Sequence, residues 1–168
     1  MLTVEALCAL LGLEPHPTEG GFFVETYRSD ERLPAAALPS RYRAARAIGT
    51  AIYYLLTPAT FSAMHRLASD EVFHFYLGDP VEMLQLWPDG SHRVVTIGTA
   101  LETGERPQVV VPRDVWQGAR LRPGGRFALL GTTVAPGFDY ADYETGRRAD
   151  LLGSHPAAGA LITALTRD

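Results

Sequence analysis

The chain has 168 residues, 46% of them hydrophobic and 20% charged, which is the size and composition of one folded globular domain. Its 15 basic residues against 19 acidic ones give a net charge of −4, a balance that disfavours a nucleic-acid-binding face. The absence of Lys and Asn excludes a lysine Schiff base, a pyridoxal-phosphate anchor and the lysine of a phosphate-binding P-loop.

The first predicted element is a short helix within residues 1–12. Apolar residues recur at helical spacing from Val4 to Leu11, Thr3 is suited to the N-cap and Gly12 to the C-terminal end. The single Cys8 lies on this pattern and is interpreted as a small buried side chain. No basic leader precedes it and no stretch approaches the roughly 20 apolar residues of a membrane span. We therefore expect a cytoplasmic protein without a membrane partner.

Strand patterns follow the helix. The first is aromatic and β-branched, from Gly21 to Arg28, and a long loop is predicted for residues 29–45. Short apolar runs with Gly, Pro and Asp between them come next. The runs are Ile48 to Leu56, Phe61 to His65, Glu71 to Leu77, Val81 to Trp87, Arg93 to Ile97, Gln108 to Val111, Trp116 to Leu121 and Phe127 to Val134.

This spacing predicts one all-β domain, an antiparallel sandwich or barrel with small helical additions. We expect the barrel and its closing motif to occupy residues 19–144 and a C-terminal arm to occupy residues 145–168. A helical turn is predicted within this arm, from Leu161 to Leu165. A barrel of this kind can hold a ligand in its mouth.

The segment from Met64 to Gly78 carries the densest polar content within an apolar frame. Strand alternation places Glu71 and Phe73 on one face and His74 and Tyr76 on the other. An inward Glu is costly unless it is paired or used. A His65–Glu71 couple, in which the carboxylate orients the ring, would suit general-base chemistry, and the alternative is a structural hydrogen bond.

The segment resembles the metal-binding motifs of cupins. His65, Glu71 and Gly78 fall on the cupin register, whereas Leu67 stands at the second His position and Gln117 at the last one. The resemblance implies a cupin jelly-roll barrel with half of the usual metal ligands missing. We therefore expect no bound metal or other cofactor, with His65, Glu71 and Gln117 as a weak metal candidate, because a catalytic site needs about three ligands.

Four ordered motifs resemble the cupin-5 family, a cupin domain of unknown function. They are residues 19–29, residues 65–76, Pro107 to Gln117 and Ala135 to Tyr140. This resemblance covers nearly the whole chain and implies a homodimer. A weaker resemblance, to dTDP-4-dehydrorhamnose 3,5-epimerase, implies His65 as a base, but the catalytic Lys of that family has no counterpart here.

The function expected from these observations is binding of a small polar, sugar-like metabolite in the barrel. Epimerase- or isomerase-like chemistry is one alternative and non-catalytic binding of a sugar or nucleotide is the other, with a metal-dependent cupin enzyme less favoured. His65 and Glu71 are the catalytic candidates. The binding candidates supply guanidinium, imidazole, amide or aromatic groups; they are Arg28, Arg66, His74, Tyr76, Trp116, Gln117 and Phe138.

Overall fold

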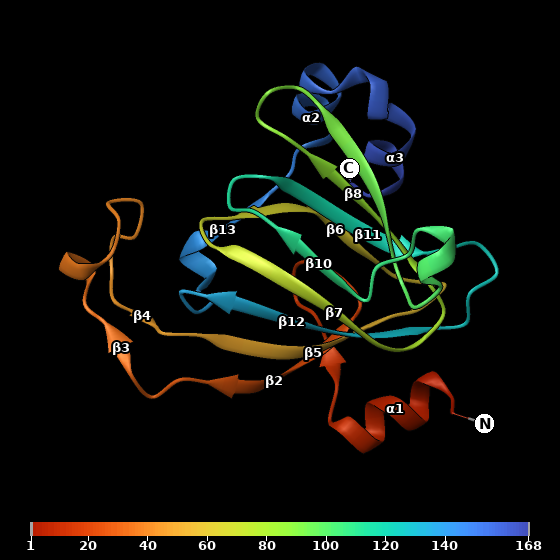
Figure 1. Cartoon of the computed structure of the whole chain (residues 1–168), viewed down its shortest axis with the longest axis horizontal. Helices are drawn as coiled ribbons and strands as arrows, with labels where there is room; N and C mark the ends of the chain where they lie inside the picture. Colours follow the sequence, from red (N-terminus) through yellow and green to blue (C-terminus); the bar gives the residue numbers. More distant parts are fainter. Residues whose placement is uncertain (1, 168) are drawn as a thin grey trace.

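A computed structural model describes residues 2–167 as two antiparallel sheets facing each other (Figure 1). The six-stranded sheet has the order β1 (Glu14–Pro15), β2 (Phe22–Arg28), β5 (Thr50–Leu56), β12 (Ala128–Ala135), β7 (Asp70–Gly78) and β10 (Gln108–Val111). The five-stranded sheet has the order β13 (Tyr143–Thr145), β6 (Phe61–Leu67), β11 (Trp116–Leu121), β8 (Val81–Leu86) and β9 (His92–Ile97). Strands distant in sequence are neighbours in both sheets, as in a jelly roll.

The other elements are short. A two-stranded ribbon pairs β3 (Arg32–Leu33) with β4 (Arg46–Ala47), and it extends beyond the main body (Figure 1). The α-helices are α1 (Val4–Leu11), α2 (Arg148–Ser154) and α3 (Gly159–Ala164). The 3₁₀ turns are η1 (Ala35–Ala37), η2 (Leu101–Thr103), η3 (Tyr140–Asp142) and η4 (Pro156–Ala158). No helix in the described part of the chain is long and apolar enough to cross a bilayer.

The predicted all-β class and N-terminal helix are confirmed. Thr3 Oγ1 accepts the backbone N–H of Ala6, and Gly12 ends α1 in the left-handed conformation at φ 66°, where a residue without Cβ has no steric penalty. Each predicted apolar run overlaps a strand. Helix α2 and the short strands β1, β3, β4 and β13 were not predicted. The strands have only two or three residues each, too few to show a period.

Three apolar clusters hold the layers together. The central one lies between the sheets and includes Tyr54, Phe73, Met83 and Leu130. Helices α2 and α3 cover the outer face of the five-stranded sheet, and α1 packs near one end of the six-stranded sheet. The rest of that outer face is open to solvent, and Tyr76 and Val110 are about half exposed there. The interior between the sheets is therefore the enclosed part of the fold.

Candidate active site

A cavity of about 130 Å³ opens between the two sheets. Both sheets and the segment after β12 contribute to its wall. Two histidines and two glutamates give it a polar side, and aromatic and aliphatic side chains form the remainder. The lining residues are His16, Glu19, Phe23, Thr50, Ile52, His65, Leu67, Glu71, Thr132, Val134, Phe138 and Tyr140.

A β-bulge in β6 directs His65 into this cavity. On β11, Gln117 pairs with His65 and Ala119 pairs with Ser62, so two steps along β11 match three along β6. Regular alternation would place Ser62 and His65 on opposite faces, because their spacing is odd. The extra residue lets both side chains face Glu19 inside the barrel. Bulges commonly re-aim side chains beside active sites.

Backbone contacts determine which nitrogen of His65 carries the proton. Nδ1 lies 2.7 Å from the carbonyl oxygen of Ala63, and a carbonyl only accepts, so Nδ1–H is the donor. In the neutral ring the Nε2 lone pair is therefore free, and it faces Glu19 Oε2 at 3.8 Å. The ring is 2% exposed and stacks on Tyr143, with centroids 5.0 Å apart. Burial raises the pKa of Tyr143 to about 12, so this neighbour is a neutral phenol.

His16 has the opposite tautomer. Its Nδ1 accepts the backbone N–H of Glu19 at 2.9 Å and that of Thr18 at 3.4 Å, so the ring stabilises this turn. Because a backbone N–H only donates, the neutral ring carries its proton on Nε2. Burial is the main cause that lowers the pKa of His16, while the charge of Glu19 opposes the shift. This favours the neutral ring.

The Glu19 carboxylate lies between the two histidines. Its Oε2 is 3.8 Å from Nε2 of His65 and 3.9 Å from Nε2 of His16, and its Oε1 accepts a hydrogen bond from Ser62. The turn that carries Glu19 is held from the far end of the chain, since Arg167 donates to the carbonyls of Thr18 and Glu19. The carboxylate that lies within 4 Å of His65 Nε2 is thus that of Glu19.

Glu71 occupies another part of the wall. Its Oε2 accepts Nε2–H of Gln117 at 2.7 Å. Burial is the largest cause that raises the pKa of Glu71, and the nearby His65 and hydrogen bonds from Thr132 and Gln117 oppose the shift. The predicted pairing of Glu71 with His65 is thus replaced by a Glu71–Gln117 hydrogen bond. Oε1 of Gln117 is buried without a partner in the described structure.

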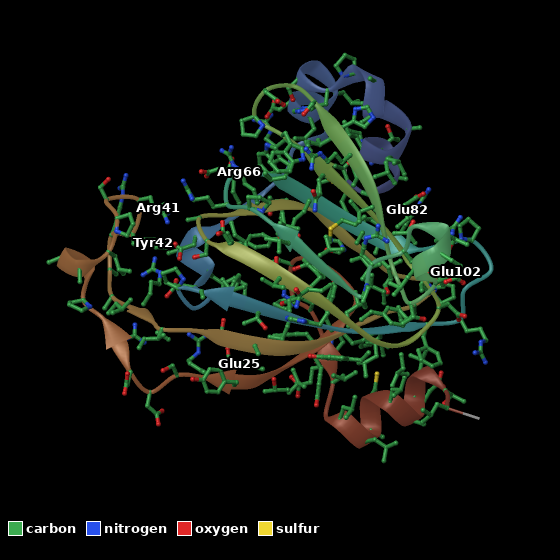
Figure 2. All side chains as sticks on the ribbon, viewed as in Figure 1. Glu25, Arg41, Tyr42, Arg66, Glu82 and Glu102 are labelled. Atoms are coloured by element: carbon green, nitrogen blue, oxygen red, sulfur yellow. The ribbon has the colours of Figure 1, made fainter. Side chains whose placement is uncertain are left out.

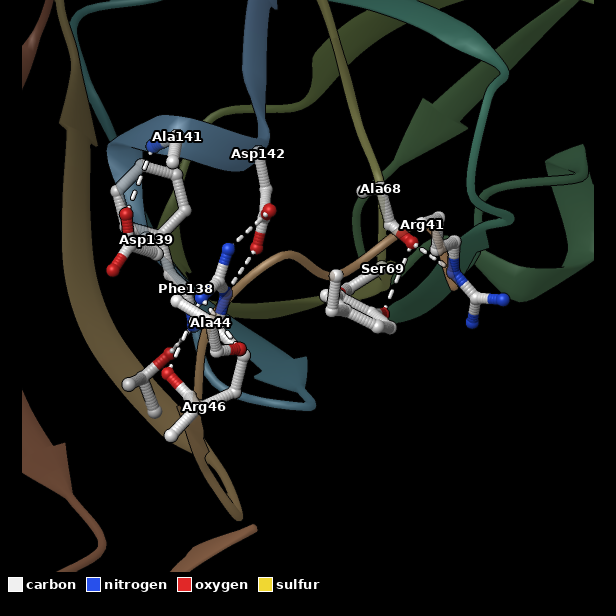
Figure 3. A network of polar contacts seen from close by, with 12 residues as sticks. Arg41, Ala44, Arg46, Ala68, Ser69, Phe138, Asp139, Ala141 and Asp142 are labelled. Atoms are coloured by element: carbon white, nitrogen blue, oxygen red, sulfur yellow. Dashed lines mark hydrogen bonds and ion pairs between the residues drawn. The ribbon is translucent and has the colours of Figure 1, made fainter. Parts of the chain in front are cut away.

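Phe138 and Tyr140, in the segment after β12, also line the cavity, and Tyr140 is about half exposed. The Phe138 N–H donates to Thr50 Oγ1 at 2.9 Å, and its carbonyl accepts from Arg28. Behind it, Arg46 and Asp142 form two hydrogen bonds of 2.7 Å in an almost fully buried ion pair (Figure 3). This pair anchors the segment to strand β4.

The remaining predicted binding residues do not line the cavity. Arg66 pairs with Glu144 and lies over the Trp116 ring at 4.5 Å, at the periphery of the molecule (Figure 2). His74 contacts Gln108 and Thr133 on the outer face of the six-stranded sheet. Tyr76 lies on that face too, edge-on to Tyr53, and Arg28 pairs with Glu25.

Of the predicted site residues, the structure places His65, Glu71 and Phe138 in the cavity wall and bonds Gln117 to Glu71. Sequence reasoning missed Glu19 as the carboxylate nearest to His65 Nε2 and His16 as a cavity residue. A signal was present: a His and a Glu three residues apart precede the Gly20-Gly21 turn. Titratable side chains beside such a turn, ahead of an aromatic strand, are candidates for a site. The contact between Glu19 and His65 was not predicted, because the two residues are far apart in the sequence.

The residues do not fit the metal site that the cupin resemblance implies. Leu67 has no donor atom, and Gln117 directs its amide N–H group at Glu71. No group of three or more His, Cys, Asp or Glu side chains suited to a metal ion is found within residues 2–167.

The chain is similar to several known proteins in sequence and in structure. Protein SO0799 from Shewanella oneidensis has 34% identity and a TM-score of 0.86 over 99% of both chains. A hypothetical protein from Leishmania major has 31% identity and a TM-score of 0.88, over 99% of this chain and 100% of that one. The uncharacterized yeast protein YML079W (Saccharomyces cerevisiae) is 30% identical over 152 residues, 83% of this chain and 76% of its own.

A dTDP sugar isomerase from Desulfovibrio desulfuricans shares the fold at 14% identity, with a TM-score of 0.52 over 74% of this chain and 83% of that one. The family model described as Cupin superfamily (DUF985) matches residues 5–146. The two facing sheets are consistent with the cupin fold that this match implies, and the chain belongs to the Cupin_5 family of the cupin superfamily.

Proposed function

We propose that the protein binds a small polar metabolite in the cavity and transfers a proton at one of its carbon atoms, as epimerases and isomerases do. His65 is the general base. One observation carries the proposal: the Nδ1–H···O=C bond to Ala63 leaves the Nε2 lone pair of a buried imidazole facing an enclosed cavity. Histidine is the side chain that most often serves as a general acid or base.

Glu19 supports the charged form of the base. When Nε2 takes a proton, the imidazolium forms 3.8 Å from a carboxylate, so the positive charge arises beside a negative one. At that distance the carboxylate makes no hydrogen bond with Nε2 in the free protein. The lone pair thus remains available to a substrate.

The size of the cavity limits the part of the substrate that is enclosed. A volume of about 130 Å³ corresponds to roughly four water molecules in the liquid, well below the typical pocket of about 300–1,000 Å³ for drug-sized ligands. The enclosed part is therefore a short polar group. A sugar or a larger molecule would extend past Phe138 and the half-exposed Tyr140.

The test is incorporation of solvent deuterium at carbon, followed by NMR or mass spectrometry. The panel contains dihydroxyacetone, free keto sugars and keto-sugar nucleotides. We expect exchange by the wild type, a loss of about 10²–10⁴-fold in His65→Gln, and unchanged exchange in His74→Gln, whose imidazole lies on the outer face. Equal exchange by the wild type and His65→Gln refutes the role of His65.

A non-catalytic binding protein is the second candidate. Glu71 and Thr132 favour it, because both line the cavity and hydrogen bonds with each other and with Gln117 hold their polar groups in place. Wild-type protein that binds a member of the panel, measured by calorimetry, and exchanges none would establish this candidate in place of the enzyme.

We also propose that the protein is a homodimer, with the strand β2 at the interface. Beyond its short pairing with β1, β2 is bonded to β5 on one side only in the described structure, and Tyr27 on it is largely exposed. Open strand edges favour pairing with a second chain. Light scattering should give twice the mass of one chain, and Tyr27→Glu should reduce it; a wild-type mass of one chain contradicts the proposal.

A further inference from the structure

We propose that His16 is a second catalytic residue, which donates its Nε2–H to the carbonyl oxygen of the substrate while His65 acts at the adjacent carbon. The substrate class is accordingly a carbonyl compound with a hydrogen on the carbon next to the C=O group. This inference rests on the proposed function and adds to it the group that stabilises the charge formed when the proton leaves.

The first argument is the complementary chemistry of the two rings. The backbone carbonyl of Ala63 holds the proton of His65 on Nδ1, and the backbone amides of Thr18 and Glu19 leave the proton of His16 on Nε2. One ring thus presents a lone pair and the other an N–H, each from Nε2. A carbonyl compound with an adjacent C–H requires one of each.

The second argument is the position of these atoms. Both Nε2 atoms lie just under 4 Å from the same oxygen, Oε2 of Glu19, and both rings line the one cavity. Within residues 2–167, the His16 Nε2–H has no acceptor at hydrogen-bond distance, since Glu19 Oε2 at 3.9 Å lies beyond it. This donor is available to a bound molecule.

The hydroxyl groups in the wall are already used. Thr50 Oγ1 accepts from the N–H of Phe138, and Thr132 bonds to Glu71. Both can rotate to other partners, whereas the His16 ring is held by two backbone bonds and by packing on Phe23 at 4.6 Å between centroids. A rigid donor is preorganised for charge that develops in the transition state.

The neutral state of His16 follows from its surroundings. Burial lowers its pKa, and His65 and Arg167 act in the same direction, while Glu19 opposes them. A neutral imidazole can still stabilise an oxyanion through its N–H, as lowered histidine pKa values in other enzymes illustrate. It also leaves His65 as the group that gains positive charge.

The step is balanced without a further reactant. The Nε2 lone pair of His65 takes the proton from the carbon; the C–H electron pair becomes the C=C bond, and the carbonyl π pair moves to oxygen. The resulting enolate oxygen accepts the His16 Nε2–H bond. Return of the proton from the His65 imidazolium to carbon restores the carbonyl, and Glu19 balances the imidazolium throughout.

Two substitutions separate this role from that of the turn. In His16→Asn the amide oxygen can stand where Nδ1 accepts the Thr18 and Glu19 amides, but the Nε2 donor is lost. In His16→Gln the amide N–H₂ can reach the Nε2 position, but the turn loses its acceptor. We expect His16→Asn to melt close to the wild type and to lose about 10²–10³-fold in exchange, and His16→Gln to melt lower yet retain more exchange.

Two further measurements do not depend on turnover. Imidazole ¹⁵N NMR should show Nε2–H for His16 and Nδ1–H for His65. Acetohydroxamate, a small enediolate mimic, should bind the wild type at least about 10-fold more tightly than it binds His16→Asn. An Nδ1–H tautomer at His16, or equal exchange and equal affinity in His16→Asn and wild type, overturns the inference.

These readouts also separate the two proposals. Loss of exchange in His65→Gln with none in His16→Asn leaves the proposed function intact and refutes the role of His16. A different outcome is that the wild type exchanges no carbonyl compound while His16→Asn binds acetohydroxamate more weakly than the wild type does. This outcome supports His16 as a hydrogen-bond donor and refutes the proton transfer.

Discussion

The inner and outer faces of strand β7 share one stretch of sequence and differ in almost every physical property. On the inner face, Glu71 and Phe73 are buried in the cavity wall and the core. On the outer face, His74 and Tyr76 are partly exposed and contact side chains of neighbouring strands. The motif from His65 to Tyr76 therefore supplies two surfaces, and only one of them encloses a ligand.

The same contrast separates the histidines. Inside the barrel, His16 and His65 are bonded to backbone groups, which act only as donors or only as acceptors. Outside it, Nδ1 of His74 lies 3.4 Å from the amide Nε2 of Gln108 and its Nε2 lies 3.3 Å from Thr133 Oγ1, and both partners are side chains that can rotate. Burial against backbone gives a histidine a defined chemical role.

The largest expected difference between the two faces of β7 is in packing. Phe73→Ala should lower the free energy of unfolding by about 3–5 kcal/mol, because it leaves a cavity in the central core. Tyr76→Ala on the outer face, where the side chain is 49% exposed, should cost about 1 kcal/mol or less. Urea unfolding followed by circular dichroism measures both. Similar losses would show that the outer face is packed as tightly as the inner one.

A buried and an exposed ion pair extend the comparison. Arg46→Ala leaves Asp142 unpaired in an almost fully buried position, and we expect a loss of about 3 kcal/mol. Arg66→Ala, which removes the partly exposed pair with Glu144, should cost at most about 1 kcal/mol. Thermal unfolding provides the measurement, and an equal effect of the two would argue against burial as the deciding factor.

The buried histidine also predicts a pH effect. The folded-state pKa of His16 is below its ordinary value of 6.5, so the unfolded chain binds the proton first as pH falls. The neutral His16 ring therefore contributes to the free energy of unfolding above pH 6.5, and this contribution is lost as the pH falls toward the folded-state pKa. The loss is about 1.4 kcal/mol for each unit between the unfolded-state and folded-state pKa values of His16. In urea unfolding at pH 7.5 and 5.0, His16→Asn should lose less stability than the wild type, and His92→Asn, on the solvent side of β9, should match the wild type. A larger loss of unfolding free energy in His16→Asn than in the wild type would contradict the lowered pKa of His16.

The smallest expected effect concerns Arg167. Arg167→Ala removes two hydrogen bonds to the turn that carries Glu19, and because this guanidinium is exposed we expect a loss of about 1 kcal/mol or less. Amide hydrogen exchange of Thr18 and Glu19 should become faster. Arg147→Ala, whose ion pair with Asp150 is largely exposed, should leave both unchanged; faster exchange in that control would indicate a general loosening of the C-terminal segment.

Local sequence patterns were sufficient to predict the elements that have a period or a stop signal. The Thr3 cap and Gly12 bound α1, and alternation with Gly and Pro punctuation located the long strands, because side-chain direction in a strand depends only on local backbone geometry. These patterns also predicted that Glu71 and Phe73 share a face opposite to His74 and Tyr76. These are properties of adjacent residues.

The carboxylate that lies beside His65 is set by a long-range contact that forms on folding. Glu19 and His65 lie on segments far apart in the sequence, and no local pattern predicts their contact. The bulge that turns both Ser62 and His65 inward breaks strand alternation. It could not be predicted from local sequence, because it depends on the pairing of β6 with β11. The tautomers of His16 and His65 were likewise decided by backbone groups that folding brings to each ring, because an isolated imidazole has no fixed preference strong enough to assign them.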